Sequence, residues 1–271
     1  MPELPEVETT RRGIARHSVG KTVARVVVRD ARLRWPVPRT LGRRLPGQLI
    51  EAVERRGKYL LLRSHTGTLI MHLGMSGSLH VLPASTPAQK HDHLDIVFTD
   101  HTCLRLRDPR RFGAALWTEV DPLTHPLLKR LGPEPLGDDF NAAYIHRRAC
   151  GRRTAIKPFI MDSKVVVGIG NIYASEALFA AGIHPARATG RVSLERCGRL
   201  VRSIRDVLQK AIVQGGTTLR DFRNSDGTPG YFQRQLAVYG RDGLPCPACG
   251  HSVRQLRQGQ RSTFYCVRCQ R

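Results

Sequence analysis

Cys246-Pro247-Ala248-Cys249 and, after a gap of sixteen residues, Cys266-Val267-Arg268-Cys269 decide the fold at the end of this chain. Each Cys-x-x-Cys turn presents two thiolates to one ion, and four thiolates complete a tetrahedral zinc site with no open position for catalysis. A thioredoxin-like redox pair is the alternative, but no βαβ pattern surrounds either motif and the motifs are paired. We therefore expect a zinc ribbon in which one structural Zn²⁺ is bound by Cys246, Cys249, Cys266 and Cys269.

The segment around these cysteines is small and strongly basic. Residues 241–271 contain six Arg and one acidic residue, Asp242, which leaves a net charge of +5. The stretch between the cysteine pairs is expected to form a hairpin, and so small a ribbon needs the metal to supply its folding energy. Its charge predicts contact with nucleic acid. Cys103, Cys150 and Cys197 stand alone in the sequence and are interpreted as buried small hydrophobic residues.

The composition of the whole chain indicates a folded protein that binds a polyanion. Hydrophobic residues make up 41% of 271 residues, which is enough for buried cores and favours two domains. Lys and Arg number 44 against 22 acidic residues, giving a net charge of +22 and a pI near 10.9. Because the positive charges run along the whole length, several segments should build the binding face. On charge alone, a ribosomal-type protein or a merely solubilised surface is the alternative.

Export and membrane insertion are not indicated by the sequence. The opening, Met1-Pro2-Glu3-Leu4-Pro5-Glu6, has no basic region followed by an apolar stretch, and nowhere do eighteen apolar residues run together. Seven Cys without an export signal point to a reducing compartment, where clustered Cys bind metal more often than they form disulfides. The cytosol is therefore the expected location.

The first half of the chain has the pattern of an antiparallel β-sandwich. Short β-branched runs follow one another between Lys21 and about Val120, with turns between them and no long helical period. The opening segment is the exception, because residues 5–12 place a proline and acidic residues before two arginines, as a helix prefers. The runs expected to be strands include Thr22 to Val28, Tyr59 to Arg63, Thr68 to Leu73, Leu94 to Thr99 and Cys103 to Arg107.

Beyond Pro133-Glu134-Pro135, interpreted as a linker, the pattern becomes helical. Residues 194–212 carry apolar side chains or Cys at spacings of one, three and four, with Ser193 as N-cap and Gly215-Gly216 as the stop. Residues 216–232 have no period and many turn formers, which is typical of a functional loop. We predict an α+β fold with an N-terminal β-sandwich domain (1–132), a helical domain (133–235) and a terminal zinc finger (236–271).

The amino terminus has the composition of a reactive site. Glu6 and Glu8 are explained by the dipole of the helix that they begin, whereas Glu3 precedes that helix. A carboxylate beside a free amino terminus can serve as acid and base when a bond at a sugar is broken. An α-amino group is about 10% neutral at pH 7, against about 0.04% for a Lys side chain. The secondary amine of Pro2 would give an iminium directly on attacking an aldehydic carbon.

Five further motifs extend from one end of the chain to the other. They are Met1-Pro2-Glu3-Leu4-Pro5-Glu6-Val7-Glu8, Arg56-Gly57-Lys58-Tyr59, His72-Leu73-Gly74-Met75-Ser76-Gly77, Asp108-Pro109-Arg110-Arg111-Phe112-Gly113 and Gly168-Ile169-Gly170-Asn171-Ile172-Tyr173. Together with the terminal ribbon, they closely resemble the Fpg/Nei family of formamidopyrimidine-DNA glycosylases, and jointly they are highly specific.

The resemblance implies a bifunctional DNA glycosylase and AP lyase of base excision repair. Such an enzyme excises oxidised purines (8-oxoguanine and formamidopyrimidines) and cleaves the strand by β,δ-elimination. The resemblance further implies that Met1 is removed, that Pro2 attacks C1′ to form a Schiff base, and that Glu3 is the proton donor. Lys58 matches the lysine that assists β-elimination, and Arg261 matches the arginine assigned to δ-elimination.

The implied partner is double-stranded DNA containing oxidised bases or abasic sites, bound by a monomer in the bacterial cytosol at the nucleoid. A glycosylase flips the damaged nucleotide out of the stack, and the family fills the hole with its counterparts of Met75, Arg110 and Phe112. Taken singly, a Met or a Phe would more often lie in the core. The other matching DNA-binding positions are His72, His91, Arg152, Lys157 and Asn171, although His91, Arg152 and Lys157 as lone residues would be solvated surface.

Val165-Val166-Val167 followed by Gly168-Ile169-Gly170-Asn171 imitates a dinucleotide-binding strand and turn. That interpretation is rejected, because the third small residue of the motif falls on Tyr173 and no strand with an acidic end follows. The family places this segment in a helix-two-turn-helix motif that holds phosphates, and the 216–232 loop matches its cover over the extruded base.

Two rival functions remain open at the level of sequence. An endonuclease VIII-like relative would use the same chemistry on oxidised pyrimidines, although the Glu-Leu-Pro-Glu opening favours the purine branch. A zinc-ribbon protein that binds DNA without chemistry is the rival from another class. Trapping of a covalent adduct on abasic DNA separates an enzyme from a binding protein.

Overall fold

The computed structural model describes residues 2–217 and 235–271, and the chain divides into two compact units. Unit 1 comprises Met1–Lys129 and Gln214–Gln233, and unit 2 comprises Arg130–Val213 and Arg234–Arg271. Apart from its first two residues, the predicted functional loop 216–232 lies outside the described residues. The division into domains 1–132, 133–235 and 236–271 stays a prediction.

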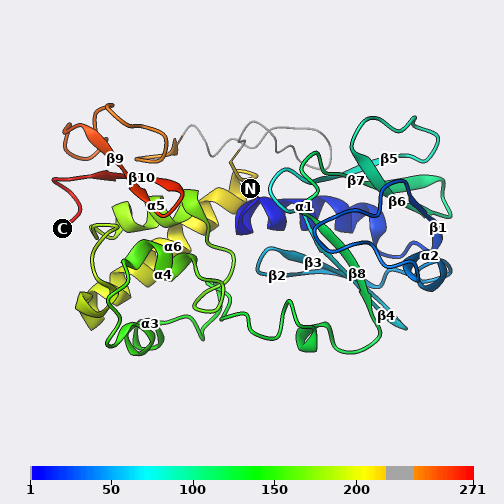
Figure 1. Ribbon diagram of the computed structural model, residues 1–271, viewed down its shortest axis with the longest axis horizontal. Coiled ribbons are helices and arrows are strands. Elements are labelled where there is room, and N and C mark those ends of the chain that lie inside the picture. Colours follow the sequence, from blue (N-terminus) through cyan, green and yellow to red (C-terminus); the bar gives the residue numbers. More distant parts are fainter. Residues whose placement is uncertain (1, 218–234) are drawn as a thin grey trace. The chain divides into compact units, whose positions relative to one another are not determined.

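Unit 1 is built on two antiparallel four-stranded sheets (Figure 1). The first has the order β1 (Val23–Val28), β6 (Asp92–Phe98), β7 (Thr102–Arg107) and β5 (Ser78–Pro83), and the second has the order β2 (Ala52–Arg56), β3 (Tyr59–Ser64), β4 (Gly67–His72) and β8 (Ala114–Thr118). Leu62 of β3 and Leu104 of β7, from opposite sheets, lie in one buried core. The predicted β-sandwich is therefore confirmed, and each of the five predicted runs forms a strand.

Helix α1 (Leu4–Ser18) opens unit 1, as predicted. Pro5 lies in its first turn, where a missing N–H costs nothing, and Glu6 lies near the positive end of the helix dipole. Val7 and Ile14 lie on one face of the helix and enter the sandwich core. The helix contacts β2, β3 and β5, which belong to both sheets, so it packs against the sandwich. Unit 1 also contains the short α2 (Leu41–Arg44) and η1 (Pro122–Thr124).

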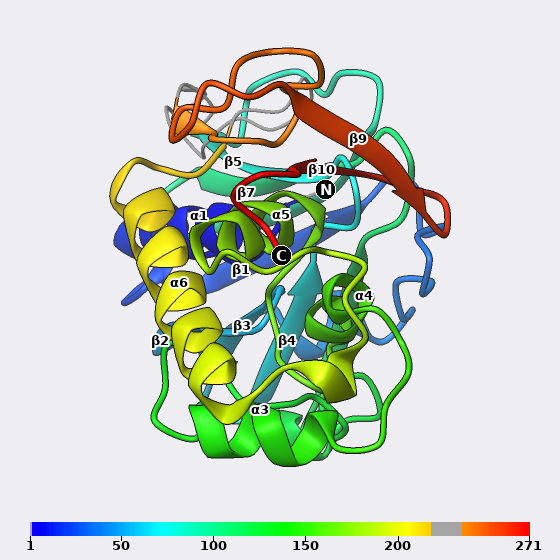
Figure 2. The same ribbon diagram turned by 90° about the vertical axis from the view of Figure 1, so that its left-hand side faces the viewer.

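Unit 2 is helical, with a terminal hairpin. Its elements are α3 (Ala142–Ala149), α4 (Ile156–Met161), α5 (Asn171–Ala180), η2 (Thr189–Arg191), α6 (Leu194–Val213), β9 (Val253–Gln258) and β10 (Arg261–Cys266). Figure 2 shows α6 alongside α3 and α5, which it contacts, with the hairpin beside α5. Helix α6 confirms the predicted helix, because Leu200, Ile204, Leu208 and Ala211 form its buried stripe and Gly215 follows with φ 74°.

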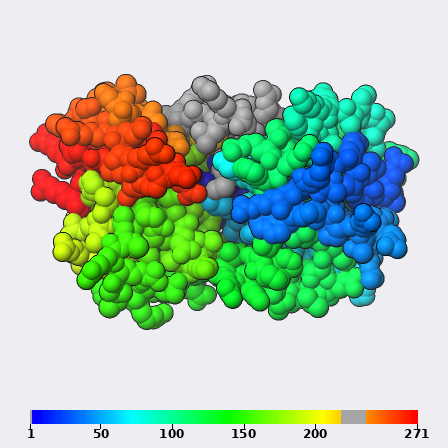
Figure 3. Space-filling model, in the orientation of Figure 1, coloured from blue at the N-terminus to red at the C-terminus, as the bar shows by residue number. Residues whose placement is uncertain are grey.

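The core of the terminal ribbon includes a side chain of helix α5. Phe264 and Cys266 of β10 pack with Phe179 of α5 and with Tyr239. The amide of Gln270 donates to the carbonyl of Ile183 at 2.9 Å, which ties the end of the chain to the turn after α5. The outward side of the hairpin stays on the surface, as Figure 3 shows in orange and red.

Two expectations from the sequence are settled by these elements. Residues 165–167 form no strand, and α5 begins at Asn171 with Gly170 as N-cap, so the rejection of a dinucleotide-binding motif is confirmed. Cys103 and Cys197 are buried as expected, but the expectation was wrong for Cys150, which is exposed because it caps the carboxyl end of α3. Within residues 2–217 and 235–271, no helix is long and apolar enough to cross a bilayer.

Candidate functional site

The residues predicted to react lie at the start of α1. Pro2 is buried, and Glu3, only 2% exposed, occupies the N-cap position of the helix in an extended conformation. The backbone N–H of Glu3 donates to Oε2 of Glu6 at 2.9 Å, which forms one half of a capping box. Glu3 is therefore fixed next to Pro2 by the helix that follows it.

Glu6 connects this terminus to a distant part of the chain. Its Oε1 accepts a hydrogen bond from the backbone N–H of Thr217 at 2.7 Å, while its Oε2 holds Glu3. A side chain at Gly216 (φ 81°) would lie 2.9 Å from Oε1 of Glu6, so the backbone can approach only because this residue is glycine. One buried carboxylate thus joins the amino end of α1 to the start of the predicted 216–232 loop.

Glu8 organises the turn that carries Lys58. Its carboxylate accepts hydrogen bonds from Arg11, Arg12 and Arg55, and Arg55 also donates to the carbonyl of Gly57 at 3.1 Å. Burial alone would raise the pKa of Glu8, but the hydrogen bonds and charges of these guanidinium groups lower it to about 2. The β2–β3 turn at Gly57 (φ 58°) is thereby tied to α1, with Lys58 as the next residue.

His72 lies opposite Tyr59, where β4 ends. The two residues pair across β3 and β4, and their rings are 4.7 Å apart. The Nδ1 atom of His72 accepts a hydrogen bond from the backbone N–H of Gly74 at 2.9 Å. Desolvation, with the charges of Lys58 and Arg34, lowers the pKa of His72 to about 4. His72 is therefore neutral at pH 7 and acts as a polar rather than a cationic group.

The three residues predicted to fill the hole in the DNA lie on two loops that are packed together. Met75 and Phe112 are exposed, at 37% and 39%, so both large apolar side chains are accessible to a ligand. The guanidinium of Arg110 lies 4.9 Å from the centre of the Phe112 ring. A Cβ on Gly74 (φ 63°) would lie 2.6 Å from the nitrogen of Gly113, so the loop that carries Met75 touches the loop that carries Phe112.

The four cysteines of the ribbon come together as predicted. Their sulfur atoms all lie within 4.8 Å of one another, with 3.9 Å between Cys246 and Cys269 and 3.5 Å between Cys249 and Cys266. Tetrahedral zinc with zinc–sulfur bonds of about 2.3 Å needs sulfur atoms about 3.8 Å apart. The donor set and its spacing therefore fit one structural Zn²⁺.

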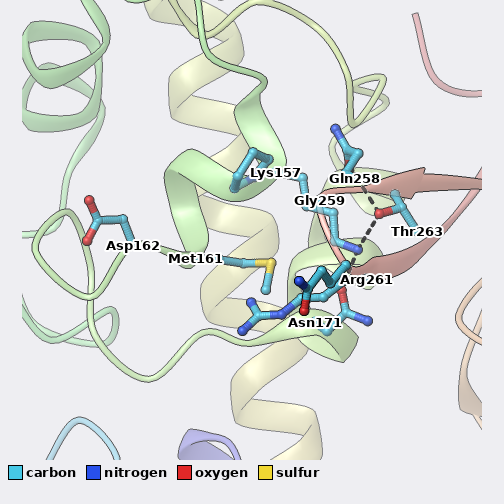
Figure 4. Close-up of a pocket in the computed structure, with 10 residues that line it drawn as sticks. Lys157, Met161, Asp162, Asn171, Gln258, Gly259, Arg261 and Thr263 are labelled. Atoms are coloured by element: carbon cyan, nitrogen blue, oxygen red, sulfur yellow. Dashed lines mark hydrogen bonds between the residues drawn. The ribbon is translucent and has the colours of Figure 1, made fainter.

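A second group of predicted residues lines one pocket of about 400 Å³ in unit 2 (Figure 4). Lys157 lies in α4, Asn171 begins α5 and Arg261 begins β10, so helix termini and the zinc hairpin meet there. Arg261 is exposed and Asn171 is partly exposed. The guanidinium of Arg261 and the amide of Asn171 thus lie at the pocket, where the amino end of α5 begins. Such an arrangement can bind an anion.

Lys157 is buried, although the sequence around it suggests a surface lysine. It is 1% exposed, so the interpretation as solvated surface was wrong. Its ammonium donates to Oδ1 of Asn171 at 2.7 Å and to the hydroxyl of Thr263 at 2.8 Å. The amide of Asn171 in turn donates to the carbonyl of Ser262 at 3.0 Å. Lys157 therefore fixes Asn171 to the zinc hairpin.

The remaining predicted residues lie apart from these groups. Arg152 is exposed, and its guanidinium lies 5.5 Å from the centre of the Phe159 ring. His91 is partly exposed and has a φ of 74°, a conformation that is costly for a residue with a side chain. The sequence indicated neither the hydrogen bond from Thr217 to Glu6 nor the one from Ser76 to the buried Asp108. Each joins residues that are distant in sequence.

Comparison with known proteins agrees with this geometry over the whole chain. Three family models match: the formamidopyrimidine-DNA glycosylase N-terminal domain over residues 1–115, the formamidopyrimidine-DNA glycosylase H2TH domain over residues 131–223, and the zinc finger found in FPG and IleRS over residues 243–271. A formamidopyrimidine-DNA glycosylase of Stutzerimonas stutzeri is 61% identical over 100% of both chains.

Solved structures agree in fold. A Lactococcus lactis FPG mutant in complex with a Fapy-dG containing DNA has a TM-score of 0.93 and 34% identity, with 100% of both chains covered. The Lactococcus lactis Fpg in complex with an abasic site containing DNA has a TM-score of 0.92 and 33% identity, with 99% of both chains covered.

The sandwich, the helix-two-turn-helix segment and the four-cysteine ribbon together define a zinc-finger DNA glycosylase of base excision repair. This chain belongs to the formamidopyrimidine-DNA glycosylase family, and its ribbon binds one structural zinc ion. The resemblance found in the sequence is thus confirmed at the level of the family, the fold and the metal.

Proposed function

We propose that this chain excises oxidised purines, 8-oxoguanine and formamidopyrimidines, from double-stranded DNA and then cleaves the strand by β,δ-elimination. The observation that carries the proposal is the burial of Pro2 directly before Glu3 at the amino end of α1. The positive end of a helix favours the neutral, nucleophilic form of an amine placed there. The Lactococcus lactis relatives bound to Fapy-dG and abasic-site DNA add support from similarity.

Pro2 is the nucleophile in this proposal, after removal of Met1 frees its nitrogen. The nitrogen attacks C1′ while the bond from C1′ to the base breaks, and the base leaves with the electron pair and takes up a proton. Glu3 protonates O4′ as the sugar ring opens, and the nitrogen of Pro2 loses its proton to give an iminium at C1′. The iminium acidifies C2′, which prepares the strand for elimination.

Strand cleavage follows as two eliminations. Loss of a proton from C2′ expels the 3′ phosphate, and loss of a proton from C4′ expels the 5′ phosphate. Lys58, held next to Gly57 in the turn that Arg55 and Glu8 brace, assists the first elimination. Arg261, exposed at the start of β10, assists the second. Water then adds to the remaining carbon–nitrogen double bond and releases the free amine of Pro2.

DNA is held by neutral, cationic and apolar groups with different tasks. Met75, Arg110 and Phe112 fill the space that the extruded nucleotide leaves, since apolar wedges and planar guanidinium groups replace a stacked base. His72, His91 and Arg152 bind the DNA backbone near the lesion. Asn171 binds a phosphate beside the pocket of Figure 4, and Lys157 orients Asn171 by donating to its Oδ1. The DNA of the bacterial nucleoid, in the cytosol, is the substrate in the cell.

An endonuclease VIII-like preference for oxidised pyrimidines is the second candidate, because the same nucleophile and acid would serve it. One panel of duplexes decides between them, each carrying a single lesion and each assayed for base release and strand cleavage. Release of oxidised purines at a higher rate than oxidised pyrimidines is the expected result. The reverse order would transfer the chain to the pyrimidine branch.

Borohydride trapping on abasic-site DNA tests the proposed nucleophile. A covalent adduct is expected on the residue-2 nitrogen of protein whose Met1 has been removed, because only a free secondary amine there forms the iminium. Peptide mass mapping locates the adduct, and protein acetylated at its amino terminus is the control that should give none. An adduct mapped to Lys58 would contradict the assignment of Pro2, and no adduct at all would favour a non-catalytic zinc-ribbon protein.

A further inference from the structure

Asp108 is a fully buried carboxylate that the proposed chemistry does not use. It lies directly after β7, is 0% exposed, and begins the loop that carries Arg110 and Phe112. Its Oδ2 accepts a hydrogen bond from the N–H of Gly113 at 2.8 Å, which closes the loop from 108 to 113 upon itself. A buried carboxylate without such donors would be strongly destabilising, so its place in the loop is specified by its partners.

Ser76 joins this loop to the loop that carries Met75. The hydroxyl of Ser76 donates to Oδ1 of Asp108 at 3.1 Å and accepts from the backbone N–H of Arg110 at 3.3 Å. One hydroxyl therefore bonds both the carboxylate and the backbone of the neighbouring loop. The close approach of Gly74 to Gly113 leaves little room for the two loops to slide against each other.

The backbone of Asp108 reaches a third segment, at His91. The N–H of Asp108 donates to the carbonyl of His91 at 3.0 Å, and the carbonyl of Asp108 is bonded by Nε2 of His93 at 2.8 Å. His91 and Arg111 both have positive φ, of 74° and 58°, and such conformations persist only where surrounding bonds hold them. Asp108 is bonded to both segments, since the N–H of Arg111 donates to its carbonyl at 3.2 Å.

We propose that Asp108 and Ser76 form a buried anchor that holds Met75, Arg110 and Phe112 as one preformed wedge for extrusion of the damaged nucleotide. The inference rests on the proposed function, in which these three residues enter the DNA. A wedge that is ordered before binding avoids the entropy cost of ordering exposed side chains and loops in the complex. Asp108 and Ser76 are thus positioning residues, which act through the residues that touch DNA.

Ser76→Ala with Ser78→Ala as matched control tests the anchor. Both serines are 6% exposed and lie two residues apart, but the hydroxyl of Ser78 bonds His80 rather than the wedge loops. Fluorescence of 2-aminopurine placed next to the lesion reports unstacking, and single-turnover assays report excision. We expect Ser76→Ala to slow unstacking and excision about 3- to 10-fold, as for loss of one or two hydrogen bonds, and Ser78→Ala to leave both near the wild-type rate.

Cutting of a preformed abasic site separates the anchor from a general loss of structure. No paired base has to be extruded there, so Ser76→Ala should slow this reaction less than it slows excision. Asp108→Asn, which replaces one acceptor by a donor, should enlarge the same pattern. If Asp108→Asn does not fold, the two serine variants decide, since each removes one oxygen atom.

The outcomes distinguish this inference from the proposed function. Equal losses in Ser76→Ala and Ser78→Ala, or unaltered unstacking in Ser76→Ala, would overturn the anchor while leaving the glycosylase intact. Wild-type protein that unstacks the lesion but releases no base would overturn the proposed function, and the fluorescence comparison of the two variants would still decide the anchor. Wild-type protein that does not unstack the lesion would overturn both.

Discussion

Glu8 in unit 1 and Glu176 in unit 2 are both buried carboxylates that anchor a segment beside proposed functional residues, yet opposite environments hold them. Three guanidinium groups surround Glu8, and they lower its pKa to about 2 against the effect of burial. Glu176 accepts hydrogen bonds of 2.8–3.0 Å from the backbone N–H groups of residues 237–239. Burial raises the pKa of Glu176, and these amides oppose the shift.

The contrast teaches how each region keeps its functional residues in place. Around Glu8, ion pairs between side chains of α1 and β2 brace the turn that carries Lys58. Glu176 holds Tyr239, whose hydroxyl accepts from the amide of Asn171 at 3.3 Å, and the same core contains the zinc ligands. The order of the second region therefore depends on both a carboxylate and a metal.

Glu3→Gln should have the largest effect, because Glu3 is a buried carboxylate that we assign to chemistry rather than to anchoring. The amide keeps the size and hydrogen-bonding reach of the side chain but cannot shuttle a proton. Single-turnover excision from an 8-oxoguanine duplex should fall by about 10² to 10⁴, the range of general acid–base catalysis. Cutting of an abasic duplex should suffer less, because the base is already gone and an aldehyde is available to Pro2.

The helix-capping position of Glu3 supplies the competing explanation. If Glu3 only caps α1, the change should cost about 1 kcal/mol of stability and slow both reactions alike. DNA affinity should hold, because the amide keeps the size of the buried Glu3 side chain. Equal and small losses on both duplexes would mean that another group is the acid.

Cys249→Ser, or a strong chelator, should affect unit 2 far more than unit 1. Loss of one thiolate opens the zinc site, and the ribbon, which carries Arg261 and five other arginines within residues 241–271, loses its order. We expect the affinity for lesion DNA to fall at least about tenfold, because several phosphate contacts go with the hairpin.

Tryptophan fluorescence isolates unit 1 in the same experiment. Trp35 and Trp117 are the two tryptophans of the chain, and both belong to unit 1. Their unfolding transition should be unaltered when the metal is removed. A loss of the tryptophan transition together with the metal would show that the sandwich also depends on the ribbon, and unchanged DNA affinity in metal-free protein would count against the role of the hairpin.

Much of the fold could be predicted because its signals are local. The cysteine spacing specified the ribbon, and the stripe of α6 specified a helix, since burial repeats at helical spacing there. Strand β2 was not among the predicted runs, because its sequence Ala-Val-Glu-Arg-Arg is mostly charged and its place in the sheet depends on pairing with β3. Tertiary pairing overrides propensity in such strands.

Site residues that lie in family motifs could be predicted from the sequence. The burial of individual side chains in the site could not. Nothing local distinguishes Lys157 from a surface lysine, and its burial follows from Asn171 and Thr263, 14 and 106 residues away. Asp108 and Ser76 likewise meet across 32 residues. Such contacts depend on how loops pack together, and neither composition nor periodicity predicts that packing.

Glu8→Gln tests the contrast with Glu176 most directly, through stability rather than through activity. The pKa of Glu8 is lowered from 4.5 to about 2, so its stabilisation is full above pH 4.5 and is lost as the pH falls toward 2. The variant should therefore be less stable than wild type at pH 7, and the difference should shrink by about 2 kcal/mol at pH 3.

Glu54→Gln is the control, because the half-exposed carboxylate of Glu54 pairs with Arg63 at 2.9 Å on the surface and should contribute less than about 1 kcal/mol at either pH. Denaturant unfolding followed by tryptophan fluorescence measures these differences in unit 1. A difference between wild type and Glu8→Gln that does not vary with pH would mean that the guanidinium groups do not hold Glu8 as a carboxylate.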